Sequence, residues 1–347
     1  YDVKNFLLSG REWYGEAFDI NNSQSFSFNF PNRSETDSIY IKTSLIARST
    51  SGTNSFYTYL NGNQVLYQSI PSTGIEYTSE YAKSSESGGY FLTAGNNITL
   101  RLDFNKGSSS ANGWLNYIEV MARRKLVMYG GQMIFKDLRS VDTGNVCEFT
   151  LSDGDGSTVW DVSDPYNITS VLYNTSGNDA VFTLATDTLK EFIAFNGQSY
   201  LNPSFAGAVE NQDLHALSDV EMVIVCPDEF YDQALRLKTI HEDQDGLSVE
   251  VIKQEHIFNE FSGGNQDICA IRDFMKMLYD RANNETGIPP KHLLLFGDGS
   301  YDMKNRIGGN TNFIVTYQSP GSLHPINTFT SDDFFGLLDI TEGGNLA

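Results

Sequence analysis

The chain has few cysteines and histidines, three and five in 347 residues. Cys147, Cys226 and Cys269 lie in separate segments, and their spacing matches neither a disulfide framework nor a zinc site. Cys226 ends a predicted strand, where a catalytic thiol could sit, but it lies in an apolar run before Pro227. Cys147 alternates within a predicted strand, and Cys269 falls between apolar positions of a predicted helix. We therefore predict three structural thiols, with Cys226 and Cys269 in the core.

Lysine and arginine are also scarce, 23 against 44 acidic residues, which gives a formal net charge of -21. Nucleic acids and anionic membranes need clustered cations, so neither is expected as a partner. No apolar run approaches the length of about 18 residues that a membrane helix needs, so no transmembrane segment is predicted. We interpret the acidity as solubility outside the cell, with binding of divalent cations as the alternative. Phosphate-binding Gly-rich loops and the Gly-X-Ser-X-Gly elbow of serine hydrolases are absent from the sequence.

The first two-thirds of the chain follow the two-residue period of β-strands. Residues 25–30 alternate serine or asparagine with phenylalanine. Many short strands separated by Gly- and Asn-rich turns predict an antiparallel, jelly-roll-like β-sandwich as a first domain, residues 1–126. A second β-rich domain is predicted over residues 127–218. The predicted strands are residues 25–30, 39–46, 56–68, 91–104 and 114–122, then 132–135, 146–151 and 180–184.

The pattern changes near Val220 to alternating strands and helices. Buried-type strands are predicted at residues 221–227, 247–252 and 293–296, the second followed by a loop around residues 263–264. A helix over 230–243 has apolar spacing through Ala234, Leu235, Leu237 and Ile240, and a helix over 267–282 has Ile268, Ile271, Phe274, Met275 and Leu278 on its apolar face. This order predicts a parallel α/β sheet. We interpret residues 219–347 as an incomplete α/β domain, because parallel sheets need more strands and both faces covered.

Acidic loops follow the last predicted strand. Asp298 and Asp302 lie in the Gly-Asp-Gly-Ser-Tyr-Asp stretch at residues 297–302, and Asp332 and Asp333 belong to a second cluster at residues 330–339. Carboxylates from adjacent loops can supply the oxygens that Ca²⁺ requires, so these four aspartates are the candidate metal ligands. The alternative is that they cap turns and helices. The Asp-Gly-Asp-Gly run at residues 153–156 lacks further oxygen ligands and is predicted to be a hairpin turn.

Four aromatic residues of the β region, Trp13, Tyr14, Trp114 and Trp160, are candidates for stacking on sugars. Aromatic residues at alternating strand positions usually belong to the core, and we favour that interpretation. Glycan binding stays open as an alternative function for the β region.

Residues 291–302, an apolar run that breaks into Gly-Asp-Gly, and residues 330–339 together resemble the first half of the gingipain-type cysteine peptidase domain, the C25 family. Residues 9–16 and 113–119 resemble the β region of the family members that act as cell-surface sortases of type IX secretion. The resemblance implies a gingipain- and caspase-like α/β domain in a secreted protein at the bacterial outer surface. Such an enzyme removes the C-terminal sorting domain of cargo proteins and attaches the cargo to surface lipopolysaccharide.

The resemblance also implies a thiolate nucleophile and a histidine, with cargo and other outer-membrane secretion components as partners. No residue of this chain matches the catalytic positions, which are expected downstream of Ala347. We therefore expect a processed or truncated piece of a longer protein, inactive as a peptidase by itself. The alternative is a non-catalytic surface module whose β-sandwiches bind glycan or protein.

Overall fold

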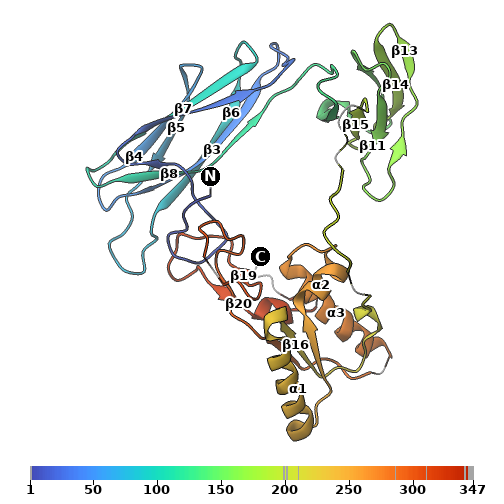
Figure 1. Ribbon diagram of the computed structural model, residues 1–347. Helices are drawn as coiled ribbons and strands as arrows, with labels where there is room; N and C mark the ends of the chain where they lie inside the picture. Colours follow the sequence, from blue (N-terminus) through green and yellow to red (C-terminus); the bar gives the residue numbers. More distant parts are fainter. Residues whose placement is uncertain are drawn as a thin grey trace.

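The computed structural model describes residues 2–197, 200, 202–209, 211–285, 287–309, 311–339 and 341–342. Three structural units follow one another along the chain (Figure 1). Two are all-β, and the third combines a parallel sheet with helices and long loops. The fold class expected from the sequence is confirmed, whereas the exact domain boundaries at residues 126 and 218 stay a prediction.

The first unit is a sandwich of two four-stranded antiparallel sheets, with strand orders β1-β8-β3-β6 and β2-β7-β4-β5. These are the strand orders of a jelly roll, in which consecutive strands alternate between the two sheets except for β4 and β5, which are neighbours in one sheet. Inward-facing positions of β7 alternate strictly through Ile98, Leu100 and Leu102. The strands are β1 (Ala17–Phe18), β2 (Ser23–Asn29), β3 (Ile39–Arg48), β4 (Asn54–Leu60), β5 (Asn63–Ile70), β6 (Lys83–Phe91), β7 (Asn97–Asn105) and β8 (Asn112–Met121).

The single strand predicted at residues 56–68 is instead a β-hairpin of two strands. Residues 56–68 divide between β4 and β5, which pair antiparallel around a two-residue turn at Asn61 and Gly62. Both residues have positive φ, 47° and 90°, as a type I′ turn requires. The predicted strand at residues 91–104 is also two strands, since it joins the last residue of β6 to most of β7, but these two strands lie in different sheets.

The second unit packs a three-stranded sheet, β10-β14-β13, against a four-stranded sheet, β12-β11-β15-β9. Phe149 and Phe182 from the first sheet and Phe192 from the second meet in its core. The prediction of a hairpin at residues 153–156 is wrong, because this turn joins β10 to β11, which lie in different sheets. The strands are β9 (Gln132–Lys136), β10 (Val146–Leu151), β11 (Thr158–Asp161), β12 (Thr169–Ser170), β13 (Asn174–Ser176), β14 (Asp179–Ala185) and β15 (Glu191–Phe195), with a 3₁₀ helix η1 (Leu138–Ser140).

The third unit has a parallel sheet in the order β17-β16-β18. Alternate residues of the central strand β16 point to opposite faces: Val223 and Val225 pack with α2 and α3, whereas Ile224 packs with α1. Its elements are η2 (Leu214–Ala216), β16 (Met222–Cys226), η3 (Asp228–Phe230), α1 (Tyr231–Asp245), β17 (Val249–Lys253), α2 (Gln254–Phe261), α3 (Ile268–Glu285), β18 (His292–Leu295), β19 (Tyr317–Gln318), β20 (Thr330–Ser331) and η4 (Asp333–Gly336).

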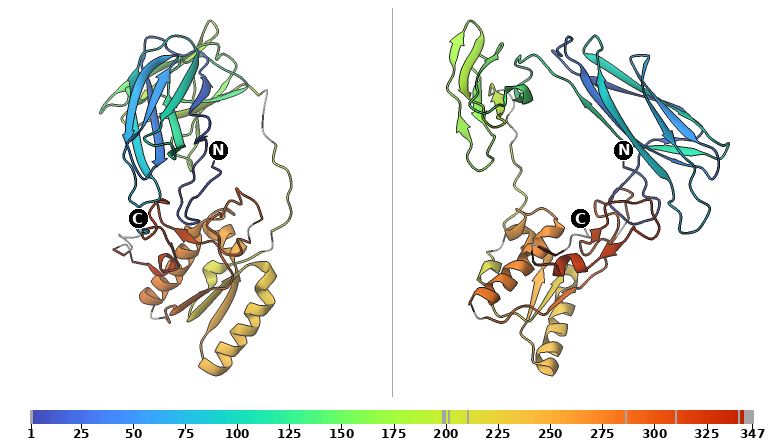
Figure 2. Two further views of the ribbon diagram at one scale, coloured as in Figure 1. Left: turned by 90° about the vertical axis from the view of Figure 1, so that its left-hand side faces the viewer. Right: turned by 180° about the vertical axis from the view of Figure 1, so that it is seen from behind.

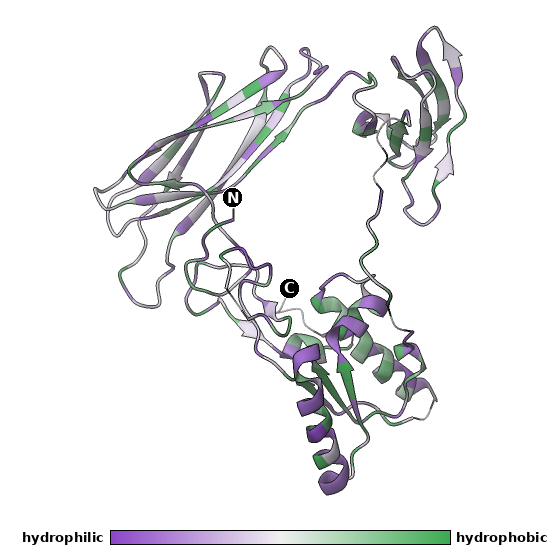
Figure 3. Cartoon of the chain, viewed as in Figure 1, coloured by the Kyte–Doolittle hydropathy of each residue, from purple (hydrophilic) through white to green (hydrophobic). Residues whose placement is uncertain are grey.

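Two expectations about its helices are corrected. The loop predicted after β17 begins with α2, whose Ile257 and Phe258 are buried against the sheet. The apolar face of α1 runs through Ala234 and Leu237 at a spacing of three, whereas Leu235 and Ile240 are exposed. Polar residues cover most of α1, and apolar residues follow the neighbouring strands (Figure 3). The apolar face predicted for α3 is confirmed.

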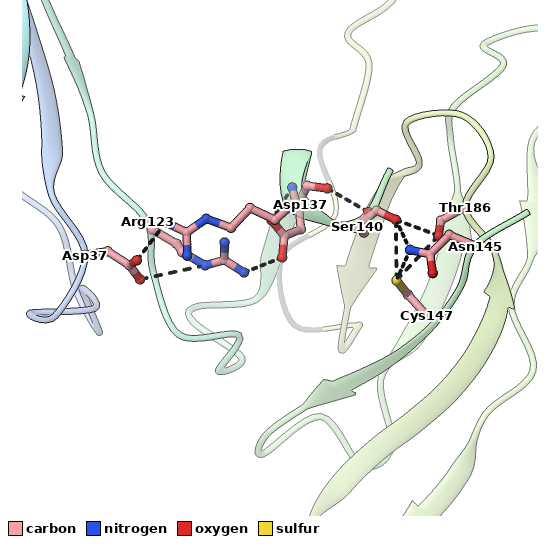
Figure 4. Close-up of polar contacts among 8 residues, drawn as sticks. Asp37, Arg123, Asp137, Ser140, Asn145, Cys147 and Thr186 are labelled. Atoms are coloured by element: carbon pink, nitrogen blue, oxygen red, sulfur yellow. Dashed lines mark hydrogen bonds and ion pairs between the residues drawn. The ribbon is translucent and has the colours of Figure 1, made fainter. Parts of the chain in front are cut away.

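A polar network joins the two β-sandwiches (Figure 4). Arg139 donates to Asp37 of the first unit at 2.7 Å, and Arg123 forms ion pairs with both Asp37 and Asp137. The Asp137 side chain also accepts the backbone N–H of Arg139 at 3.0 Å and so caps η1. Hydrogen bonds from Ser34 and Arg139 hold the pKa of Asp37 below its usual range. The connection at residues 122–131 therefore has a defined geometry at one end of each sandwich.

Candidate functional site at the carboxyl edge of the parallel sheet

The loop that follows β18 lies against residues 312–316. The carbonyl of Asp298 accepts hydrogen bonds from the backbone N–H groups of Phe313 and Ile314, at 3.0 and 3.2 Å. A side chain at Gly297 would crowd Ile314, and one at Gly299 would overlap Thr316. The two glycines are therefore required for this close approach of two loops, which explains the Gly-Asp-Gly sequence by packing.

The four predicted metal ligands take different positions. Asp302 is fully buried, and its two oxygens accept the backbone N–H groups of Arg306 and Ile307 at 2.9 and 3.0 Å. Asp298, Asp332 and Asp333 are exposed. In the part of the chain that the structure describes, no three His, Cys, Asp or Glu side chains form a group that could hold a metal ion. Asp302 thus caps a turn, and the Ca²⁺ site stays a prediction.

A cavity of about 460 Å³ opens beside this loop. Four segments of the chain form it: residues 10–13, residues 266–268 at the start of α3, residues 301–306 after β18, and residues 315–318. Trp13 stacks on Tyr301 with ring centroids 5.6 Å apart and planes 9° apart, and the guanidinium of Arg306 lies 4.9 Å from the Trp13 ring centroid. The cavity thus lies beyond the carboxyl ends of the strands, where α/β sheets bind their ligands.

The N-terminal segment closes one side of the cavity through backbone and side-chain hydrogen bonds to residues 318–322. Gly10 N–H donates to Gln318 Oε1 at 3.0 Å, and Arg11 N–H donates to the Ser319 carbonyl at 3.0 Å. Glu12 N–H donates to Ser322 Oγ at 2.8 Å, and Glu12 Oε2 accepts Ser322 N–H at 3.2 Å. These reciprocal bonds tie the jelly roll to the α/β unit.

Gly10 and Tyr14 show how closely this segment is packed. Gly10 has φ +83°, and a Cβ there would overlap the carbonyl oxygen of Gly321. The Tyr14 side chain is buried and donates to Glu12 Oε2 at 2.9 Å. Burial, with the neighbouring Glu12 carboxylate, raises the pKa of Tyr14 well above its ordinary value, so the hydroxyl stays a donor. Three of the four proposed sugar-stacking residues, Trp13, Tyr14 and Trp114, are buried, while Trp160 is 40% exposed.

The thiols do not form a nucleophilic site. Cys226 is fully buried at the end of β16, and burial raises the pKa of its thiol to about 11. Cys147 is partly buried, donating to the Ser140 carbonyl at 3.5 Å and accepting from Asn145 at 3.3 Å (Figure 4). The expectation that Cys269 lies in the core is wrong: it is exposed at the start of α3, beside the buried Ala270. Partial desolvation and the charge of Asp267 still raise its pKa.

The sequence interpretation missed the cations of the cavity, Arg11, Lys304 and Arg306. The sequence contains a weak indication of two of them. Basic residues are scarce in this chain, 23 in all, and Lys304 and Arg306 directly follow the predicted loop at residues 297–302. Arg11 lies in the segment that carried the family resemblance, but nothing local indicates that it meets residues three hundred positions later.

Residues 215–345 match the model of peptidase family C25, so the α/β part of the chain carries a domain of that cysteine peptidase family. The gingipain-type resemblance of the sequence is confirmed. The crystal structure of dimeric latent PorU from Porphyromonas gingivalis is similar to 95% of this chain and 33% of that chain, with 28% sequence identity and a TM-score of 0.82. The chain therefore spans about a third of the length of that PorU chain.

Two further solved structures are similar to smaller parts of this chain. The insecticidal delta-endotoxin Cry8Ea1 from Bacillus thuringiensis matches 32% of this chain and 20% of its own, with 14% identity and a TM-score of 0.24. The carbohydrate-binding module CBM36 matches 34% of this chain and 95% of its own, with 14% identity and a TM-score of 0.22. No curated protein matches the chain. Among the described residues, no helix has the length and hydropathy needed to cross a membrane.

Proposed function

We propose that this chain is the N-terminal portion of a secreted, sortase-type cysteine peptidase on the bacterial outer surface. The whole enzyme cleaves the C-terminal sorting domain from type IX secretion cargo and attaches the cargo to surface lipopolysaccharide, working with other outer-membrane secretion components. The observation that carries the proposal is the likeness to latent PorU, which extends over both β-sandwiches and the α/β unit.

The chemistry proposed is acyl transfer through a thioester. A thiolate attacks the scissile carbonyl, a histidine transfers the proton to the leaving amine, and an incoming amine or water releases the acyl group. None of the three thiols described above is suited to the attack. Burial, with the charge of Glu255, raises the pKa of the Cys226 thiol, which is the opposite of what a thiolate nucleophile needs. We assign the nucleophile to a part of the whole enzyme outside this chain.

In this proposal the chain contributes structure and substrate contacts. The jelly roll and the α/β unit meet at the cavity beside β18, and this junction provides a surface where cargo can be held next to the catalytic part. Among the described aromatic residues proposed for sugar binding, only Trp160 keeps substantial exposure, so no observation favours the glycan-binding alternative.

The test compares this chain with the longer protein that contains it and the remainder of a C25 domain. We expect the longer protein to release sorting domains from cargo fragments, and residues 1–347 alone to release none. Mass spectrometry of the products locates the cleavage and any transferred amine. A longer protein that leaves every sorting domain intact would contradict the proposal.

Matched variants separate the thiols of this chain from the nucleophile. Cys226→Ala and Cys269→Ala in the longer protein should retain cleavage, since neither thiol is proposed to react. Loss of turnover in a folded Cys269→Ala variant would overturn the assignment of the nucleophile to another part of the enzyme.

A further inference from the structure

The charged residues that line the cavity between the N-terminal segment and the α/β unit are mainly positive, although the protein as a whole is strongly negative. The chain carries a net charge of -21, yet Arg11, Lys304 and Arg306 line the cavity, and among the described residues of its lining only Asp267 is acidic. The carboxylate of Asp267 accepts the backbone N–H of Cys269 at 2.8 Å and so caps α3. The cavity is therefore locally basic within an acidic protein.

The three cations are not equally engaged. Arg306 lies near Asp2 at 3.5 Å and Asp302 at 3.9 Å, and it stacks on Trp13. Neither Arg11 nor Lys304 has a carboxylate within 4.0 Å in the described ranges of the chain. The Arg11 guanidinium lies 5.8 Å from the ring centroid of Tyr317, and the Lys304 side chain is exposed at the rim. Two cations are thus available to an incoming anion.

The rest of the lining is largely apolar. Ile268, Met303 and Val315 contribute aliphatic surface, and the stacked rings of Trp13 and Tyr301 form one wall. A volume of about 460 Å³ is within the range that holds a ligand of a few residues. Two cations beside an apolar lining suit a single carboxylate attached to an apolar body. A phosphate group would need a denser set of donors, of the kind that backbone N–H groups and several cations supply together.

We propose that this cavity binds a carboxylate of a peptide, with Arg11 and Lys304 facing the charge and an apolar side chain of the peptide against Ile268 and Met303. The peptide nature of the ligand rests on the proposed function, whereas the charge and the apolar contact rest on the cavity itself. The carboxylate comes either from the C-terminus of the peptide or from an Asp or Glu side chain within it.

Direct binding to residues 1–347 tests this without any peptidase activity. The probes are N-acetyl-Leu-Phe with a free carboxylate, the same peptide with a C-terminal amide, and N-acetyl-Glu-Phe amide, measured by isothermal titration calorimetry. A charge-assisted contact predicts a Kd about tenfold lower for a carboxylate probe than for the uncharged amide. The free-carboxylate probe and the Glu probe distinguish the two sources. Binding should weaken with rising salt, because the contact is electrostatic and partly exposed.

Variants locate the site. Lys304→Gln and Arg11→Gln should remove the preference for carboxylate over amide, and neither change touches the backbone bonds of the N-terminal segment. Arg236→Gln, an exposed cation on α1, is the matched control and should leave the Kd unchanged. Equal Kd values for the uncharged amide and both carboxylate probes would overturn the inference. So would binding of inorganic phosphate in the absence of peptide binding.

The outcomes are independent of the function test. If the longer protein cleaves sorting domains but residues 1–347 show no carboxylate preference, the cavity proposal fails and the proposed function stands. If the preference is found but no sorting domain is cleaved, the cavity is a peptide site in a protein with another role.

Discussion

The two β-sandwiches of this chain have similar architecture but different relations to the α/β unit. The jelly roll sends residues 10–14 into the α/β unit, where they pair with residues 318–322 and line the cavity. The second sandwich lies apart from the α/β unit in each view and connects to it through an extended segment (Figures 1 and 2). The jelly roll therefore helps to build the site, whereas the second sandwich is joined to the α/β unit only along the chain.

The physical basis of the difference is the kind of contact each sandwich makes. The jelly roll docks through hydrogen bonds that each involve a backbone N–H group of residues 10–12 or 322, and through a glycine that permits close approach. These contacts fix the position of the segment as well as its proximity. The second sandwich contacts the jelly roll through partly exposed ion pairs among Asp37, Arg123, Asp137 and Arg139. Ion pairs of this exposure contribute little and weaken with salt.

Truncation of a buried core side chain should cause the largest loss of stability and should show most clearly whether the two sandwiches unfold independently. Phe192→Ala removes a fully buried ring that packs on Phe135, Phe149 and Phe182. We expect a loss of about 3–5 kcal/mol from the second sandwich alone. Differential scanning calorimetry should show the unfolding transition of the second sandwich at a lower temperature. The hydrogen-exchange rates of residues 10–14 should stay unchanged, because their docking does not depend on the second sandwich.

The matched variant is Phe56→Ala, which removes a fully buried ring of the jelly roll. It should raise hydrogen exchange at residues 10–14 and 318–322 as well, because the docked segment belongs to the same unit. If Phe192→Ala perturbed those residues equally, the two sandwiches would not be independent.

A change at the docking site should have an intermediate effect. Gly10→Ala introduces a Cβ at φ +83° that overlaps the Gly321 carbonyl. Backbone strain of about 1–3 kcal/mol, with the overlap added, should release the segment. We expect faster proteolysis within residues 5–14 and lower affinity for any ligand of the cavity.

Gly95→Ala is the control for strain alone, since Gly95 has φ +81° with nothing within 4 Å of the added Cβ. It should reduce stability by about 1–2 kcal/mol without releasing residues 5–14. Equal proteolysis of the two variants would show that close packing at Gly321 does not hold the segment.

The smallest effect is expected at the connection between the sandwiches. The folded-state pKa of Asp37 is lowered, so its contribution is complete above the ordinary value of about 4 and is lost as pH falls through the lowered value. Small-angle scattering should therefore show a wider range of inter-sandwich arrangements at acid pH. Asp37→Asn should produce a similar change near neutral pH, whereas Asp243→Asn, exposed on α1, should not.

Local pattern alone determined several features of this protein. Period-two alternation in residues 25–30 and the apolar run ending at Cys226 predicted strands correctly. The positions of β2 alternate between exposed and half-buried, and every residue of β16 is buried, so each strand's own sequence reflects how it is covered. The apolar face of α3 followed from the helical spacing of Ile271, Phe274 and Leu278 in the same way. The Gly-Asp-Gly stretch at residues 297–299 carried the family resemblance, and its glycines serve a close approach of loops.

Only the tertiary structure decided the features that depend on partners distant in sequence. Trp13 is buried because it meets Tyr301, and α2 forms where Ile257 and Phe258 can pack on the sheet. Cys269 is exposed because a one-residue step around α3 separates it from the buried Ala270, a difference of about 100° that an apolar run does not reveal. The cavity itself joins residues near positions 10, 267 and 304, and no local pattern encodes a contact across such separations.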